Sequence, residues 1–270
     1  MSDLQVPAKA GWRGRLRGIS LESAFFVISP LMLLLAWELL SRTGVIDARF
    51  FSAPTKIVAR MWQMILDGSL LKDTWITLWR LVLGSLLGII PGLVIGVIMG
   101  LYRVPRAIIN PLIAATYPLP RVALFPLILI VFGLTEQSII IQVALGPFFT
   151  MVIATTAAVM NIEPIYLRVA KSYRTPTLLL YTKVVLPAAM PIIFSALKIS
   201  LGLGMLGVVA AEFLMASSGL GYMIWNSWQI LSLERSMVGL VTSGILGFIL
   251  LRLLDAAEHW AIPWNEERQN

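Results

Sequence analysis

The sequence predicts an all-α polytopic membrane protein with six transmembrane helices, and three observations carry that prediction. Hydrophobic residues make up 58% of the 270-residue chain and charged residues only 13%, which is about half the share of a soluble domain. The apolar residues gather in six long stretches, each close to the ~20 residues that a helix needs to cross a bilayer. Basic residues outnumber acidic ones by 21 to 14, a bias that is typical of loops retained on the cytoplasmic side.

The same composition excludes several classes of function. The chain has no cysteine and a single histidine, His259, so we predict no disulfide, no thiolate nucleophile and no metal site. No basic patch is interleaved with a surface that could read bases, so we expect no nucleic-acid partner. An intramembrane enzyme would need paired catalytic groups at one depth, whereas Glu38, Glu136 and Glu212 lie on different spans. We therefore predict that the chain is not an enzyme.

The predicted spans follow one another along the chain. A basic N-terminal segment, residues 1–20, precedes the first span at 24–40. No small-residue cleavage site follows, so we expect an uncleaved helix that starts in the cytoplasm. The other spans are predicted at these residues: 78–102, 108–132, 138–159, 187–216 and 237–254. Six crossings return the C-terminal tail, residues 259–270, to the cytoplasm.

Residues 21–77 hold the first span and an amphipathic connection. Ile57, Met61, Met64 and Ile65 recur at the spacing of one helical face, which predicts a helix lying on the membrane surface. Because the first span starts in the cytoplasm, the connection that follows it would lie outside. Its basic residues, however, are typical of a cytoplasmic loop. The side of the membrane on which it lies is therefore left open.

The second span carries a stripe of glycines at every fourth residue. The five members are Gly84, Gly88, Gly92, Gly96 and Gly100. Small residues at this spacing form a smooth face that allows another helix to approach closely. The stripe predicts a tightly packed helix bundle and names no function.

The third span is broken by prolines. Pro118, Pro120 and Pro126 each remove a backbone donor and bend a helix. Irregular backbone at membrane depth is tolerated where it is buried in protein or lines a wet cavity. Arg121 lies in this broken stretch, and an intramembrane arginine indicates a functional site. The alternative is that its side chain extends to the cytoplasmic surface.

The segment between the fourth and fifth spans, residues 161–186, is basic and punctuated by proline. A short helix at 164–174 would place apolar and aromatic side chains on one face and basic ones on the other. The apolar face consists of Tyr166, Val169, Ala170 and Tyr173, and the basic side includes Arg168, Lys171 and Arg174. Thr175 and Pro176 are an N-cap and a first helical residue, so we expect a second helix there that runs to residue 185. Leu186 and Pro187 would then turn the chain into the fifth span.

Such a helix–turn–helix elbow suits the docking of a soluble partner. The alternative is an amphipathic surface that rests on anionic lipid.

The elbow resembles the cytoplasmic "EAA" loop of binding-protein-dependent ABC importer permeases, whose pattern is Glu-Ala-Ala-x3-Gly-x9-Ile-x-Leu-Pro. The second alanine of the pattern falls on Ala170, its isoleucine on Val184 and its Leu-Pro on Leu186 and Pro187. Val169 stands at the first alanine. Arg168 stands at the glutamate and Arg174 at the glycine. The resemblance therefore does not by itself predict the usual ionic contact with the ATPase or a left-handed turn at residue 174.

Four other segments are similar to the branch of that family that imports nitrate, bicarbonate, taurine and aliphatic sulfonates. They are TWITLWRLVLG at 74–84, PLPRVALFPLILIVFGLT at 118–135, GVVAAEFL at 207–214 and SSGLGYMIWNSWQ at 217–229. The resemblance covers residues 30–264. It implies a MetI-like type I importer core at 78–258 in the inner membrane. It also implies a second permease copy in a homodimer, cytoplasmic ATPase subunits and an extracytoplasmic substrate-binding protein.

The chain lacks the GxxxxGK[ST] loop that cradles nucleotide phosphates, so ATP would be bound by the partner subunit. By the same resemblance, the translocation path would run between two permease copies, lined by the third and fifth spans. The candidates are Pro118, Pro120, Arg121, Pro126, Ser195, Lys198 and Glu212. Two cations on the path would suit a small anion. Alternatively, Lys198 extends to the cytoplasmic surface, and Glu212 is a helix-packing partner.

Other functions remain open at this point. A passive channel or uncoupled carrier of the same fold, or an exporter, would have the same composition, and an ATP requirement separates them. Within the importers, a pyrimidine precursor or an aromatic carboxylate is an alternative substrate.

Overall fold

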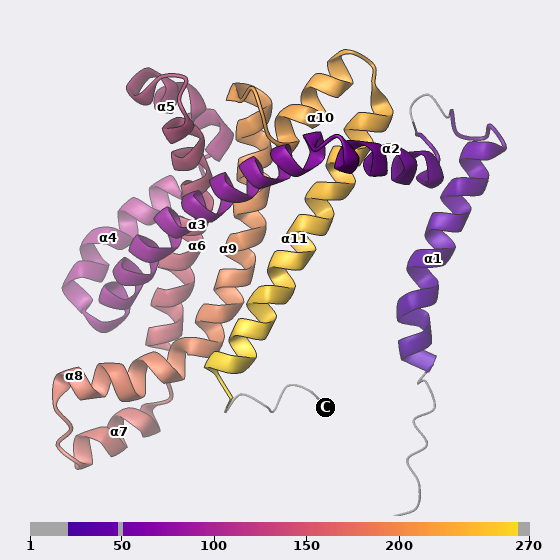
Figure 1. Ribbon diagram of the computed structural model, residues 1–270. Coiled ribbons are helices and arrows are strands. Elements are labelled where there is room, and N and C mark those ends of the chain that lie inside the picture. Colours follow the sequence, from indigo (N-terminus) through magenta and orange to yellow (C-terminus); the bar gives the residue numbers. More distant parts are fainter. Residues whose placement is uncertain (1–20, 48–50, 264–270) are drawn as a thin grey trace, which may run out of the picture. The chain divides into compact units, whose positions relative to one another are not determined.

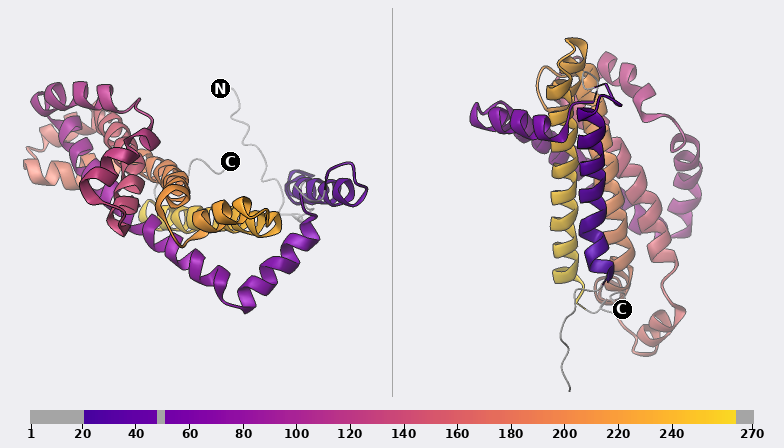
Figure 2. Two further views of the ribbon diagram at one scale, coloured as in Figure 1. Left: turned by 90° about the horizontal axis from the view of Figure 1, so that it is seen from above. Right: turned by 90° about the vertical axis from the view of Figure 1, so that its right-hand side faces the viewer.

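The computed structural model describes residues 21–47 and 51–263 (Figures 1 and 2). Within this part every regular element is a helix and no strand occurs. The chain divides into two compact units, Met1–Thr55 and Lys56–Asn270. The predicted N-terminal segment 1–20 and most of the predicted tail lie outside the described residues.

The first unit is built on α1 (Leu21–Arg42), which covers the predicted first span. The carboxylate of Glu38 accepts hydrogen bonds from the Thr55 amide at 3.1 Å and from the Thr55 hydroxyl at 2.8 Å. The hydroxyl of Ser41 donates to the carbonyl oxygen of Phe51 at 3.0 Å. These bonds close the loop that follows α1, and Glu38 supplies a negative charge where α2 (Pro54–Leu66) begins.

The second unit continues through α2 into a bundle of long helices. They are α3 (Ser69–Leu101), α4 (Arg103–Thr116), η1 (Arg121–Leu124), α5 (Phe125–Phe132), α6 (Glu136–Met160), α7 (Pro164–Ser172), α8 (Thr177–Leu180), η2 (Tyr181–Val185), α9 (Leu186–Met215), α10 (Leu220–Gln229) and α11 (Leu233–Ala261). In Figures 1 and 2, α7 and α8 lie at one end of this bundle and α10 lies at the other. We call these the elbow end and the α10 end.

Four unbroken helical segments of the described chain are long and apolar enough to cross a membrane. They are Ser69–Leu101, Glu136–Met160, Tyr181–Met215 and Leu233–Ala261, and the pair formed by α4 with η1 and α5 gives a fifth span bent by 94°. Helix α1 is not among them, so the count of six spans stays a prediction. Helix α3 begins well before the predicted residue 78, and α10 was not predicted as a helix.

The core lies where α3 and α9 pack on α6. All five glycines of the predicted stripe face α6. A Cβ atom placed on Gly88 would lie only 2.2 Å from the carbonyl oxygen of Ala144, and one on Gly100 would lie 2.5 Å from Cβ of Val159. Because the two backbones approach this closely, α3 and α6 form a rigid pair against which the other spans are positioned.

Candidate functional site

The elbow, residues 161–186, begins with α7, which starts at Pro164 and ends at Ser172. Its C-terminus closes with a left-handed residue, because Arg174 has a φ of +48°. The Thr175 amide donates to the carbonyl oxygen of Ala170 at 3.1 Å. This six-to-one bond after a left-handed residue is the Schellman arrangement, in which glycine is usual. The turn is therefore made at residue 174 even though an arginine stands there.

The second half of the elbow differs from the regular helix that the sequence predicts. Helix α8 has only four residues, Thr177–Leu180, and the chain then widens into the π-helical η2. Leu186 and Pro187 stand where the helical chain changes direction between α8 and α9 (Figure 1), and Val185 and Leu186 keep right-handed helical angles, so the change is made without a loop. Proline fits the first turn of a helix, where its missing N–H has no partner to lose. The elbow thus runs directly into the span α9.

The predicted apolar face of α7 is divided by the structure. Ala170 is buried, whereas Tyr166, Val169 and Tyr173 are 51%, 48% and 82% exposed, and Tyr166 also lines a recess within the chain. A side chain as large as Tyr173 that touches so little of its own chain is suited to contact another molecule. The docking surface that the chain offers is therefore centred on Val169 and Tyr173, and the half-exposed Tyr166 also lines the recess.

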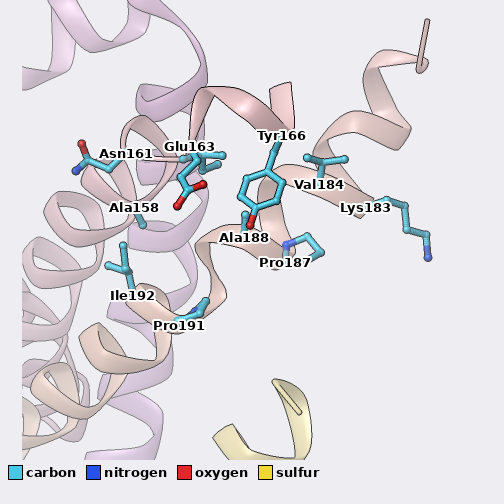
Figure 3. Close-up of a pocket in the computed structure, with 11 residues that line it drawn as sticks. Ala158, Asn161, Glu163, Tyr166, Lys183, Val184, Pro187, Ala188, Pro191 and Ile192 are labelled. Atoms are coloured by element: carbon cyan, nitrogen blue, oxygen red, sulfur yellow. The ribbon is translucent and has the colours of Figure 1, made fainter. Parts of the chain in front are cut away.

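The recess has a volume of about 600 Å³ and lies between the end of α6, α7, η2 and the start of α9. Its floor is apolar, and its polar side chains include Glu163, Tyr166 and Lys183. Figure 3 shows the Glu163 carboxylate and the Tyr166 ring turned toward the recess, while the Lys183 ammonium group points away from it. The exposed Glu163 thus faces the recess, and Lys183 faces away from it.

The broken third span places Arg121 against α6. The chain breaks between α4 and η1, with Pro120 extended at φ −60° and ψ 112°, and Pro126 stands in the first turn of α5. The side-chain amide of Gln142 on α6 donates to the Arg121 carbonyl oxygen at 2.9 Å. This hydrogen bond ties the start of η1 to α6.

The guanidinium of Arg121 lies over a glycine in the middle of α6. Its Nη1 is 3.6 Å from the position that a Cβ atom on Gly146 would take. Gly146 is ten residues into the 25-residue α6, about 15 Å from the α10 end of that helix at 1.5 Å per residue. The guanidinium makes no hydrogen bond or ion pair with any residue the structure describes, and the buried Oε1 of Gln142, one helical turn away, has no partner there either. The guanidinium therefore lies beside the middle of α6 and not beyond either end of that helix.

Two candidates from the fifth span are already engaged. The Ser195 hydroxyl donates to the carbonyl oxygen of Pro191 at 3.0 Å. The Lys198 ammonium contacts Asp255 and Glu258 of α11, each at 2.5 Å. In this conformation Lys198 acts as a link between α9 and α11, so it is not a free charge on a path.

Glu212 is the centre of a buried ion cluster. Its carboxylate is 2.9 Å from Nη1 of Arg80 on α3, and both side chains are almost completely buried. The Arg80 guanidinium also donates two hydrogen bonds, of 2.6 and 2.8 Å, to the carboxylate of Glu136 at the start of α6. Its Nη1 donates to the Ser218 carbonyl oxygen at 2.7 Å. Glu212 is thus a packing partner at the α10 end, as the alternative interpretation of the sequence had it.

The same cluster caps the start of α10. Three consecutive amides donate to side-chain oxygens of α3 and α9: Gly219 to Asp73 at 3.0 Å, Leu220 to Thr77 at 2.8 Å and Gly221 to Glu212 at 2.8 Å. Asp73, Thr77 and Arg80 follow the i, i+4, i+7 spacing of one helical face. That spacing is a signal in the sequence, but the residues they bind lie 56 to 146 positions away, so the pairing could not be predicted from it.

Comparisons with known proteins agree with this geometry. A family model described as the binding-protein-dependent transport system inner membrane component matches residues 92–260. A protein named as a probable ABC transporter permease of Brucella abortus is 31% identical over 93% of this chain and 98% of its own length. The aliphatic sulfonates transport permease protein SsuC of Bacillus subtilis is 30% identical over 88% of this chain and 86% of its own. The taurine transport system permease protein TauC of Escherichia coli is 29% identical over 88% of each chain.

A solved structure supports the fold. A chain of the MetNI methionine ABC transporter in inward-facing conformations superposes with a TM-score of 0.55 at 21% identity. The match covers 73% of this chain and 96% of that chain. The helical core is therefore MetI-like.

Proposed function

Because the chain belongs to the family of binding-protein-dependent transport system inner membrane components and is the permease subunit of an ABC importer, we propose that it admits a small anion such as a sulfonate or nitrate. Members of this family work with ATPase subunits, a substrate-binding protein and a second permease. We propose that the second permease is another copy of this chain. The elbow end faces the cytoplasm, as do both termini, and the α10 end faces the binding protein.

The proposed path runs between the two copies, along the broken span and α9. The observation that carries the choice of an anion is the guanidinium of Arg121, which lies at mid-depth over Gly146 with no partner among the described residues. An unpaired cation in a low-dielectric wall attracts anions from either end of a path. Ser195 and Lys198 lie on α9 nearer the elbow end, and their present partners would have to exchange if they take part in transport.

The elbow is the proposed site at which the ATPase drives this path. It joins α9 through η2 without a flexible linker. A displacement of α7 by a closing ATPase dimer would therefore move α9 directly. We propose that Val169 and Tyr173 are the side chains that the ATPase holds.

The test is uptake into proteoliposomes that contain the permease, its ATPase and its binding protein. Labelled taurine, an alkanesulfonate and nitrate are offered to the wild-type complex, and import of none of them would reject the proposed substrate class. With the imported anion, Arg121→Gln should lower uptake about tenfold or more, because a loss of 1.4 kcal/mol in attraction is tenfold. Arg121→Lys should recover part of it, and Arg103→Gln, which removes an exposed cation at the first residue of α4, should change nothing. Wild-type uptake in Arg121→Gln would remove this arginine from the path.

A further inference from the structure

The elbow has a strong and uncompensated positive charge. Residues 161–187 include four basic side chains and one acid. Arg168, Arg174 and Lys183 are exposed, and none of the three makes an ion pair with a residue that the structure describes. The acid, Glu163, is exposed and faces the recess while Lys183 points out of it (Figure 3), so a single negative charge stands against four positive ones.

The cations surround the two side chains offered for docking. Arg168 precedes Val169, and Arg174 follows Tyr173. A specific protein–protein interface covers about 800 Å² on each partner, which is much more than these two apolar side chains provide. Any interface centred on Val169 and Tyr173 therefore covers both arginines as well. A guanidinium that loses water without gaining a carboxylate costs binding free energy.

From this arrangement we propose that the ATPase groove which receives the elbow carries acidic side chains opposite Arg168 and Arg174. The inference rests on the proposed function of the elbow as the ATPase docking site. It adds the sign of the charge on the ATPase groove, because a groove with its own arginines or lysines would repel this elbow. Lys183, at the outer rim, would strengthen the long-range attraction and its dependence on salt.

Lipid is the other anionic surface within reach of a cytoplasmic loop. The geometry favours the protein partner, because the cations flank Tyr173, the most exposed aromatic side chain of the elbow. A membrane-bound helix would turn such a ring into the bilayer. Helices α7 and α8 instead lie at one end of the bundle (Figure 1), where a soluble protein can reach them.

The experiment uses the full chain in nanodiscs of neutral phosphatidylcholine and the ATPase subunit that co-purifies with the tagged chain from its native membrane. Arg168→Gln removes one charge. Arg174→Gly removes the other and places the favoured residue at the left-handed position, so lost binding cannot be blamed on a broken turn. Each variant should weaken ATPase binding about tenfold, and the double variant about a hundredfold. The wild-type affinity should fall as salt rises, and the double variant should lose most of that dependence. Arg103→Gln is the matched control and should bind as the wild type does.

Tyr173→Ala separates this inference from the proposed docking site. If Tyr173→Ala releases the ATPase and the arginine double variant does not, the docking site stands and the acidic groove is rejected. If neither change releases the ATPase, the docking site itself is wrong. If the double variant instead loses only its binding to vesicles that contain phosphatidylglycerol, the cations serve lipid and the inference is overturned. Arg168→Glu should abolish binding to the ATPase. If replacing an acid of the ATPase groove by lysine restores the binding of that variant, the pairing of Arg168 with the acid is established.

Discussion

Arg80 and Glu212 are 1% and 0% exposed, and their ion pair joins α3 to α9 across 132 residues of sequence. The pair also holds the start of α10 and, through Glu136, the start of α6. Four elements that are separate in the sequence are thus fastened at one end of the bundle. The opposite end, which carries the elbow, has no described ion pair of this burial. The two ends are therefore held differently: the α10 end by buried charges, and the elbow end by apolar packing that includes Ala158, Val185 and Ala189.

We expect Arg80→Met to destabilise the protein by about 3–5 kcal/mol, because it leaves the Glu212 carboxylate buried without its cation. Thermal unfolding in detergent would measure the loss. Arg42→Met is the control, since Arg42 pairs with Glu38 at an exposed position and such pairs contribute only about 0–1 kcal/mol. Adding Glu212→Leu to Arg80→Met should restore part of the stability, because the unpaired charge is then removed. An Arg80→Met protein as stable as the wild type would show that the cluster is not what holds this end.

The glycine stripe gives a prediction about packing alone. Gly88→Ala should cost about 1–3 kcal/mol or more, because its new methyl group would lie 2.2 Å from a backbone oxygen of α6 that cannot move independently. Gly244→Ala on α11 adds the same atom where nothing lies within 4 Å, so it should be neutral or slightly stabilising. Unfolding midpoints of the two variants in the same detergent decide the matter. Equal midpoints would mean that α3 and α6 are not in this close contact.

These two cases show what could and could not be predicted from the sequence. The five glycines share a local spacing, so their common face follows from helical geometry. The partner of Arg80 on α9 is distant in the sequence. No local pattern in the sequence indicates that residues 80 and 212 lie together. The break in the third span follows from its prolines, whereas the 94° bend and the contact of Arg121 with Gly146 depend on how α6 packs. At Arg174 the residue type argued against a left-handed turn, and the bond from Thr175 to Ala170 overrides that preference.

Arg174 gives a prediction about the elbow itself. A left-handed conformation costs a residue with a Cβ atom about 1–2 kcal/mol, so Arg174→Gly should stabilise the turn by about 1 kcal/mol. The Thr175 amide, which donates to Ala170, should then exchange its hydrogen roughly five times more slowly. Arg174→Val should speed that exchange, because a β-branched residue tolerates the left-handed region poorly. Exchange followed by mass spectrometry on the peptide that contains Thr175 would measure both changes. No difference between the glycine and valine variants would contradict the observed backbone angle.

Tyr173 and Tyr166 give a matched pair within one helix. Tyr173 is 82% exposed, so Tyr173→Ala should leave the thermal stability unchanged while it lowers recovery of the ATPase and, with it, transport. Tyr166 lines the recess between α7 and the start of α9, so Tyr166→Ala should loosen the elbow against its own chain before it affects the partner. Two quantities should therefore be measured for each variant. One is the ratio of ATPase recovered to permease inserted, and the other is the rate of amide hydrogen exchange in α7. We expect Tyr173→Ala to lower the ratio with wild-type exchange, and Tyr166→Ala to speed exchange with a smaller loss of ATPase. The reverse pattern would assign docking to the recess side of α7, and the motion would then reach α9 through Tyr166 instead of through η2.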